Sequence, residues 1–134
     1  MSITDDGQYG DKQIRFLEAI WGEGFLSPGG VTEIDLVLER IDCTGLRILD
    51  IGCGCGGAVF RLIRHHNAGE CTGIDIEPLV IERADQLAEQ YGIADQCNFL
   101  TVSPGPLPFD DGSFDMIFSL SLIHISEPTR LHLI

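Results

Sequence analysis

Hydrophobic residues recur along this chain with two different spacings, one typical of amphipathic helices and the other of buried strands. Apolar side chains repeat at helical spacing over residues 11–21 and again over residues 31–41, and a glycine-rich loop separates the two segments. From residue 47 onward, short apolar runs alternate with further helical patterns. The pattern therefore predicts two N-terminal helices followed by an alternation of strands and helices.

Four short apolar runs predict strands, at residues 47–51, 71–76, 98–102 and 114–119. Helices are predicted between them at residues 57–66 and 78–91, where Pro78 suits a first helical turn. The prolines between residues 104 and 108 exclude a helix or a central strand there. Strands that alternate with helices at this spacing form right-handed βαβ units around a parallel sheet, so the chain predicts an α/β fold.

The segment from Arg47 to Gly57 carries the strongest functional signal. It reads Arg-Ile-Leu-Asp-Ile-Gly-Cys-Gly-Cys-Gly-Gly, an apolar strand that contains a carboxylate and continues into a run of glycines. Glycines allow a sharp turn and let a ligand approach the backbone closely. A helix is predicted directly afterwards, and strand, glycine loop and helix N-terminus together form a cradle for a nucleotide cofactor.

Two cofactors fit this glycine loop. Gly52, Gly54 and Gly57 satisfy the G-x-G-x-x-G pattern of dinucleotide sites, whereas Gly52, Gly54 and Gly56 satisfy the G-x-G-x-G pattern of S-adenosylmethionine sites. Asp75, at the end of the second predicted strand, can accept hydrogen bonds from both hydroxyls of a ribose, which both cofactors contain. A turn residue at the strand end is the alternative for Asp75. Neither feature separates the two cofactors.

Asp50, just before the first glycine, does separate them. A carboxylate there would crowd the pyrophosphate that an NAD site brings to this turn, and like charges at close range repel strongly where water is scarce. S-adenosylmethionine has no phosphate, and its cationic amino group and sulfonium are attracted by a carboxylate. The alternative for Asp50 is a helix-capping or turn acceptor.

Composition narrows the class of protein. A chain of 134 residues is one domain at most, and its 44% hydrophobic residues suffice for a packed core. The formal net charge of −13 disfavours nucleic-acid and membrane partners. We see no apolar run long enough for a transmembrane helix and no signal peptide. The five cysteines are irregularly spaced, which favours reduced thiols in the cytoplasm. We expect no metal site at Cys53 and Cys55, because no partner pair follows at zinc-site spacing.

Three segments in order resemble those of class I S-adenosylmethionine-dependent methyltransferases. They are the glycine loop, then Thr-Gly-Ile-Asp-Ile at residues 72–76, then Leu-Pro-Phe-Asp-Asp-Gly-Ser-Phe-Asp-Met-Ile-Phe-Ser at residues 107–119. The resemblance covers about residues 9–119. It implies a Rossmann-like, doubly wound parallel sheet, truncated here to four strands in the order 3-2-1-4, with S-adenosylmethionine as the cofactor.

The resemblance also implies roles for the site residues. Asp50 would lie near the methionyl amino group, and Gly52, Gly54 and Gly56 would wrap the cofactor. Asp75 would take the ribose, while Ile76 would flank the adenine.

The segment Trp-Gly-Glu-Gly-Phe-Leu-Ser-Pro-Gly-Gly, residues 21–30, is similar to one in phosphoethanolamine (phosphobase) methyltransferases and related bacterial small-molecule enzymes. The resemblance implies that Ser27 closes over the cofactor, with a plain turn residue as the alternative. It places Tyr9 at the position of a catalytic tyrosine near the reacting amine, with an aromatic residue that anchors the N-terminus as the alternative. Ser103 departs from the family, because an acidic residue usually binds the adenine amino group there. We expect that hydrogen bond to be weaker without charge assistance.

Residues 120–130, Leu-Ser-Leu-Ile-His-Ile-Ser-Glu-Pro-Thr-Arg, resemble the in-frame translation of a transposon-end adapter used in sequencing libraries. We therefore expect the native reading frame to be lost after Ser119. The chain then divides into an N-terminal helical cap with a cofactor-covering loop (1–45), a partial methyltransferase core (46–119) and a non-native tail (120–134). His124, in the tail, falls one residue short of the family's functional histidine, so we assign it no role.

Because domains of this family contain further strands, such a fragment made alone is expected to expose the edge of its fourth strand and to be unstable and inactive. The parent protein is predicted to be a methyltransferase that acts on a small molecule, such as an amine of the phosphobase type. The acceptor would attack the sulfonium methyl directly, in line. Two alternatives stay open: an NAD-dependent oxidoreductase, and a cofactor-binding module without turnover.

Overall fold

The computed structural model describes residues 10–26 and 29–120. Its helices are α1 (Asp11–Trp21), α2 (Gly30–Val37), α3 (Gly57–His65) and α4 (Pro78–Gln90), with a short 3-10 helix, η1, at Ala94–Gln96. Its strands are β1 (Arg47–Ile51), β2 (Glu70–Asp75), β3 (Cys97–Thr101) and β4 (Met116–Phe118). Apart from η1, each element lies where the hydrophobic pattern predicts it.

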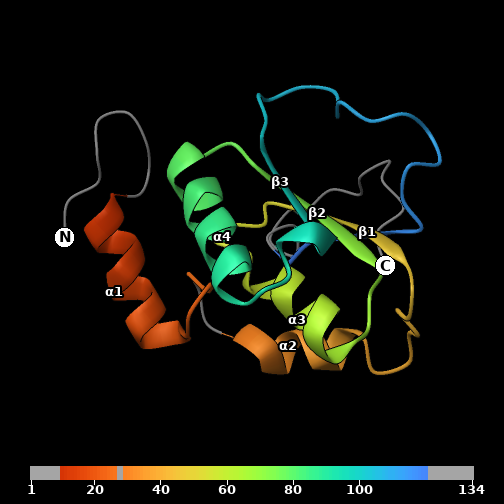
Figure 1. Cartoon of the computed structure of the whole chain (residues 1–134), viewed down its shortest axis with the longest axis horizontal. Coiled ribbons are helices and arrows are strands. Elements are labelled where there is room, and N and C mark those ends of the chain that lie inside the picture. The colour runs from red at the N-terminus through yellow and green to blue at the C-terminus, as the bar shows by residue number, and fades with distance from the viewer. Residues whose placement is uncertain (1–9, 27–28, 121–134) are drawn as a thin grey trace.

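The strands form one parallel sheet in the order β3-β2-β1-β4, which confirms the predicted α/β topology (Figure 1). β1 is central, and its residue Asp50 is in register with Gly73 of β2 on one side and with Phe118 of β4 on the other. The chain runs outward from β1 to β3 and then returns to the far side of β1. Open α/β sheets bind their ligands at such a reversal, beyond the carboxyl ends of the strands.

α3 and α4 cover the same face of the sheet, because both pack against β2 and both connect neighbouring strands with the same right-handed crossover. α2 packs against α3 (Figure 1). Buried apolar side chains fill the space between helices and sheet, among them Ile48, Val59, Leu62, Leu87 and Phe118. Burial of these side chains is the main force that holds the layers together.

A second, smaller core joins α1 to the glycine loop. Ile14 of α1, Cys55 of the loop and Val80 of α4 pack together, and none of them is more than 2% exposed. The N-terminal helix therefore lies directly on the segment that follows β1.

Two predicted boundaries differ from the structure by more than one residue, the end of α2 and the start of β4. α2 ends at Val37, not near residue 41, because the chain tightens into a turn in which the N–H of Ile41 donates to the carbonyl of Leu38 at 3.0 Å. β4 spans three residues, because Asp115 instead pairs with Arg47 through its own N–H and its carboxylate. No helix in the described part of the chain is long and apolar enough to cross a membrane.

Candidate functional site

The glycine loop lies beyond the carboxyl end of β1 and against the end of β2. The N–H groups of Gly52 and Cys53 both donate to the carbonyl oxygen of Ile74, at 2.9 and 3.0 Å. Gly52, Gly54 and Gly56 have φ angles of +74°, +54° and +91°, a region that other L residues rarely adopt. The glycines of the G-x-G-x-G pattern are therefore required by the path of the backbone.

Gly56 and Gly73 also permit close packing around the loop. A Cβ on Gly56 would lie 2.9 Å from Cζ of Phe60 and 3.0 Å from Cζ of Phe99. A Cβ on Gly73, in β2, would lie 2.8 Å from the Phe99 ring and 2.9 Å from Cβ of Cys53. Side chains at either position would displace these neighbours, so the loop is packed tightly on the sheet and on α3.

Asp75 ends β2 and holds the loop from the neighbouring strand. Its Oδ2 accepts a hydrogen bond from the N–H of Gly54 at 2.9 Å, and its Oδ1 accepts one from the N–H of Glu77 at 3.1 Å. Each carboxylate oxygen has a second lone pair, so Asp75 can also accept hydrogen bonds from a ligand. The turn role is thus observed, and the ribose role stays a prediction.

Asp50 lies in β1 beside the loop and is only 3% exposed. Burial raises the pKa of its carboxyl group well above the usual range, and the charge of Asp75 raises it further. α3 begins after Gly56 and has no side-chain cap, so the helix-capping alternative for Asp50 is wrong. Burying one carboxylate beside another is unfavourable unless a cation compensates the charge, and the position therefore favours a positively charged ligand.

Ile76 and Ser103 follow β2 and β3 at the same edge of the sheet. Ile76, the residue after Asp75, is a large apolar side chain that is 52% exposed, and Ser103 is exposed as well. The N–H of Val102 donates to the carbonyl of Asp75 at 2.9 Å, which keeps the two strand ends side by side. Their contacts with an adenine stay predictions. Tyr9, Ser27 and residues 121–134 of the predicted tail, which include His124, lie outside the described residues.

The N-terminal loop contacts the glycine loop in a way that the sequence analysis missed. The carbonyl oxygen of Gly24 accepts a hydrogen bond from the N–H of Gly57, the first residue of α3, at 3.0 Å. A Cβ on Gly57 would lie 2.7 Å both from that oxygen and from the ring of Phe25. The doublet Gly56-Gly57 was the sequence signal for this contact. Only Gly56 has a positive φ, whereas Gly57 is needed because Gly24 and Phe25 approach it closely.

The five cysteines are free thiols, and four of them are buried: Cys43, Cys53, Cys55 and Cys71. Burial raises the pKa of the Cys55 thiol to about 12 and that of Cys53 well above its usual range. Neutral thiols at these positions act as small apolar side chains that fill the loop. Among residues 10–26 and 29–120, no group of three or more His, Cys, Asp or Glu side chains is placed to hold a metal ion.

The site thus combines two carboxylates, a tightly packed glycine backbone and an exposed apolar side chain at the ends of β1 and β2. Asp50 suits a cationic group, Asp75 suits hydroxyl donors, and Ile76 suits a flat apolar group. A ligand that carries all three groups would match the arrangement.

Comparisons with known proteins agree with this architecture. A family model described as a methyltransferase domain matches residues 48–134. Phosphoethanolamine N-methyltransferase 3 of Arabidopsis thaliana is 30% identical over 131 residues, and the match covers 96% of this chain and 26% of that protein. A probable chloroplastic tocopherol O-methyltransferase of Oryza sativa subsp. japonica is 36% identical over 131 residues, covering 82% of this chain and 36% of that protein.

A solved structure agrees over most of the described residues. It is phosphoethanolamine N-methyltransferase 2 of Haemonchus contortus in complex with phosphomonomethylethanolamine and S-adenosylhomocysteine. Its TM-score is 0.75 at 30% identity, over 86% of this chain and 27% of that one. This chain spans only 26% to 36% of the length of the two curated relatives described above.

Proposed function

Since this chain belongs to the methyltransferase-domain family, we propose that the protein transfers a methyl group from S-adenosylmethionine to a small molecule, with an amine of the phosphobase type as acceptor. The observation that carries the proposal is the buried carboxylate of Asp50 beside the glycine loop, with Asp75 at the end of the next strand. Relatives and a solved structure that are named for methyl transfer support the reaction class.

The described residues fit S-adenosylmethionine. Asp50 would attract the cationic amino group, which would compensate the burial that raises its pKa. Asp75 would accept hydrogen bonds from the ribose hydroxyls. Ile76 would cover the adenine, and Ser103 would accept a hydrogen bond from the adenine amino group.

Two features disfavour the NAD alternative. A pyrophosphate at this loop would approach the carboxylate of Asp50, and like charges in a buried setting repel strongly. In addition, the N–H of Gly57, at the helix N-terminus where a phosphate would bind, already donates to the carbonyl oxygen of Gly24. That oxygen carries partial negative charge and would repel a phosphate.

When bound, the cofactor would supply an electrophilic methyl group, carried on a sulfonium, for transfer to the acceptor. The residues of this chain contribute orientation and exclusion of water rather than covalent chemistry. The family resemblance adds two roles to the proposal: Ser27 would help to close the N-terminal loop over the cofactor, and Tyr9 would lie near the reacting amine. The rigid packing around Gly56 supports orientation, because it fixes the backbone against which the cofactor would lie.

We further propose that the protein acts in the cytoplasm on free small molecules. The free cysteines and the net charge of −13 support this, because reduced thiols suit a reducing compartment and the charge repels nucleic acids and anionic membranes. We also propose that the native sequence departs after Ser119. The resemblance of residues 120–130 to an adapter-encoded sequence supports this, whereas the family match, which runs on to residue 134, does not. Experiments on activity therefore use the full-length protein, with the sequence after Ser119 read from the source DNA without library adapters.

Transfer of an isotopically labelled methyl group tests the proposed function. We expect label from S-adenosylmethionine to appear on phosphoethanolamine or its methylated derivatives, and we expect none with the Asp50→Asn variant. Label on a phenolic acceptor alone would show that the reaction class is right and the acceptor class wrong. Binding of S-adenosylhomocysteine without transfer to any amine or phenol would favour the non-catalytic module.

A further inference from the structure

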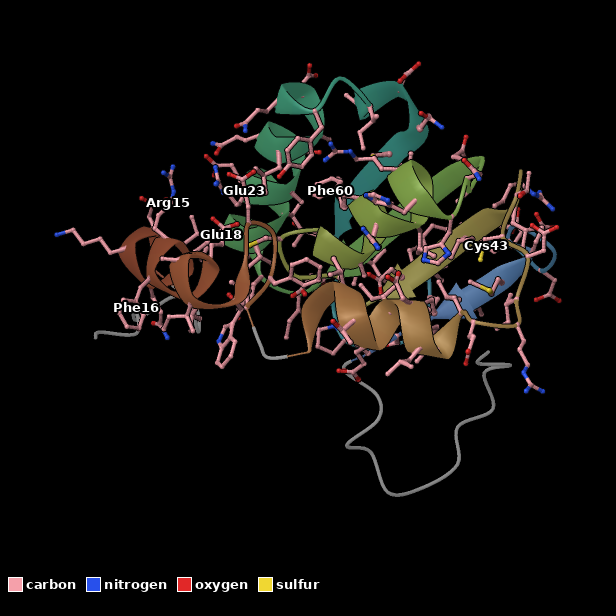
Figure 2. All side chains as sticks on the ribbon, turned by 90° about the horizontal axis from the view of Figure 1, so that it is seen from below. Arg15, Phe16, Glu18, Glu23, Cys43 and Phe60 are labelled. Atoms are coloured by element: carbon pink, nitrogen blue, oxygen red, sulfur yellow. The ribbon has the colours of Figure 1, made fainter. Side chains whose placement is uncertain are left out.

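A buried ion pair joins α1 to α4 next to the glycine loop. Glu18 of α1 is 7% exposed, and its carboxylate accepts hydrogen bonds from Nε of Arg83 at 3.1 and 3.3 Å. Nη2 of Arg83 lies 3.0 Å from Oε1 of Glu18 and 3.7 Å from Oε2 of Glu23. Glu18 and Glu23 are labelled near one another in Figure 2. A carboxylate this buried requires its partner, because a single buried charge is strongly unfavourable.

The same carboxylate holds the backbone of the N-terminal loop. Oε2 of Glu18 accepts a hydrogen bond from the N–H of Gly24 at 2.8 Å. The carbonyl oxygen of Gly24 in turn accepts a hydrogen bond from the N–H of Gly57 at 3.0 Å. Gly24 has a φ of +86°, and a Cβ there would lie 3.0 Å from Cα of Gly57. One continuous chain of contacts therefore runs from Arg83 through Glu18 and Gly24 to the first residue of α3.

Neighbouring contacts reinforce this connection. The hydroxyl of Tyr91, at the end of α4, donates to Glu23, which lies in the same loop. Beneath the loop, Cys55 packs with Ile14 and Val80 in the second core.

We propose that Glu18 is a positioning residue for cofactor binding. Held by Arg83, it fixes Gly24 so that the Gly24 carbonyl stays on the Gly57 N–H, and it thereby holds the N-terminal loop against the glycine loop. We call the contacts from Arg83 through Glu18 and Gly24 to Gly57 the latch. The inference rests on the proposed function, because it assigns this latch to the S-adenosylmethionine site. Glu18 does not touch the cofactor in this scheme and acts only through the backbone of Gly24 and Gly57.

Two substitutions separate the parts of this latch. Glu18→Ala removes both the ion pair and the acceptor for the Gly24 N–H. Glu18→Gln keeps an oxygen that can accept that N–H but removes the charge opposite Arg83. Asp115→Ala is the matched control, because it breaks the ion pair with Arg47 at the opposite, amino-terminal end of β1, where Nη2 and Oδ1 lie 3.0 Å apart.

The test combines hydrogen exchange with ligand affinity in the full-length protein, at a temperature where each variant is fully folded. In Glu18→Ala we expect exchange of the Gly57 amide to accelerate and the Kd for S-adenosylhomocysteine to rise, each by about tenfold. In Glu18→Gln we expect both changes at about threefold. Asp115→Ala should lower the melting temperature and leave both readouts as in the wild type.

The two readouts distinguish the possible failures. If the Gly57 amide exchanges at the wild-type rate in the folded Glu18 variants, the latch is wrong. If exchange accelerates while the Kd stays unchanged, the latch exists but has no role in cofactor binding, and the proposal is overturned. If the wild type itself binds no S-adenosylhomocysteine, the proposed function fails, whereas exchange at Gly57 still decides the latch. If Glu18→Ala does not fold, the same two readouts in Glu18→Gln test the proposal.

Discussion

Asp50, buried in β1, and Asp75, at the end of the neighbouring strand β2, are electrostatically coupled: burial raises the pKa of Asp50, and the charge of Asp75 raises it further. Two acidic groups at adjacent strand ends thus meet where the glycine loop begins. Such an unfavourable pair of acidic groups is typical of a binding site, where a bound ligand compensates the negative charge. The stability of the unliganded protein and its affinity for a cation are therefore coupled at Asp50.

Replacing Asp50 should move stability and binding in opposite directions. Asn is of similar shape and carries no charge, so Asp50→Asn removes the buried carboxylate without leaving a cavity. We expect the unliganded variant to gain about 1 kcal/mol at neutral pH, a rise in Tm of roughly 3–6 °C. Calorimetric titration should at the same time detect no binding of S-adenosylhomocysteine. If the Asp50→Asn variant has a lower Tm than the wild type and binds S-adenosylhomocysteine as tightly, the ligand does not compensate the charge of Asp50.

The raised pKa of Asp50 also predicts how pH acts. The folded state holds the proton of Asp50 more tightly than the unfolded chain, so this group adds stability at low pH that is lost as pH rises through its raised pKa. Binding of a cationic group needs the ionised form, so affinity for S-adenosylhomocysteine should fall as pH is lowered through the same range. Affinity measured from mildly alkaline to mildly acidic pH checks this. A profile that is flat, or that rises toward acid, contradicts the role of Asp50.

Packing at Gly56 gives a prediction about stability. Gly56→Ala places a Cβ at a φ of +91° and within 3.0 Å of two phenylalanine rings. We expect a loss of about 3 kcal/mol, because backbone strain and overpacking add. Gly92→Ala has a comparable φ of +72° with no atom within 4 Å of the added Cβ, so its loss should be about 1 kcal/mol. Equal losses in urea denaturation would mean that the close packing around Gly56 is unimportant.

Much of the fold follows from local pattern. The strand at 47–51 agrees with prediction to the residue, because an apolar run bounded by a polar segment and by glycines leaves little choice of boundary. The glycines of the G-x-G-x-G pattern have the positive φ angles that the pattern requires. Asp50 and Asp75 meet because parallel strands bring their carboxyl ends to one edge of the sheet.

Other features depend on tertiary contacts that no local pattern records. Ile20 and Trp21 belong to the apolar helical pattern of residues 11–21, yet both are exposed in α1, and the charged Glu18 is buried. Its partner Arg83 lies 65 residues away along the chain, so the pair appears only when α1 packs against α4. The contact between Gly24 and Gly57 is likewise a meeting of two distant loops.

Thermal unfolding of the full-length protein with S-adenosylhomocysteine and, separately, with NAD tests the central claim most directly, because only a ligand that binds the native state raises the melting temperature. At about a hundredfold excess over its Kd, S-adenosylhomocysteine should stabilise the protein by about 2.7 kcal/mol, and NAD should leave the melting temperature unchanged. Stabilisation by NAD alone would contradict the methyltransferase account and restore the dinucleotide alternative.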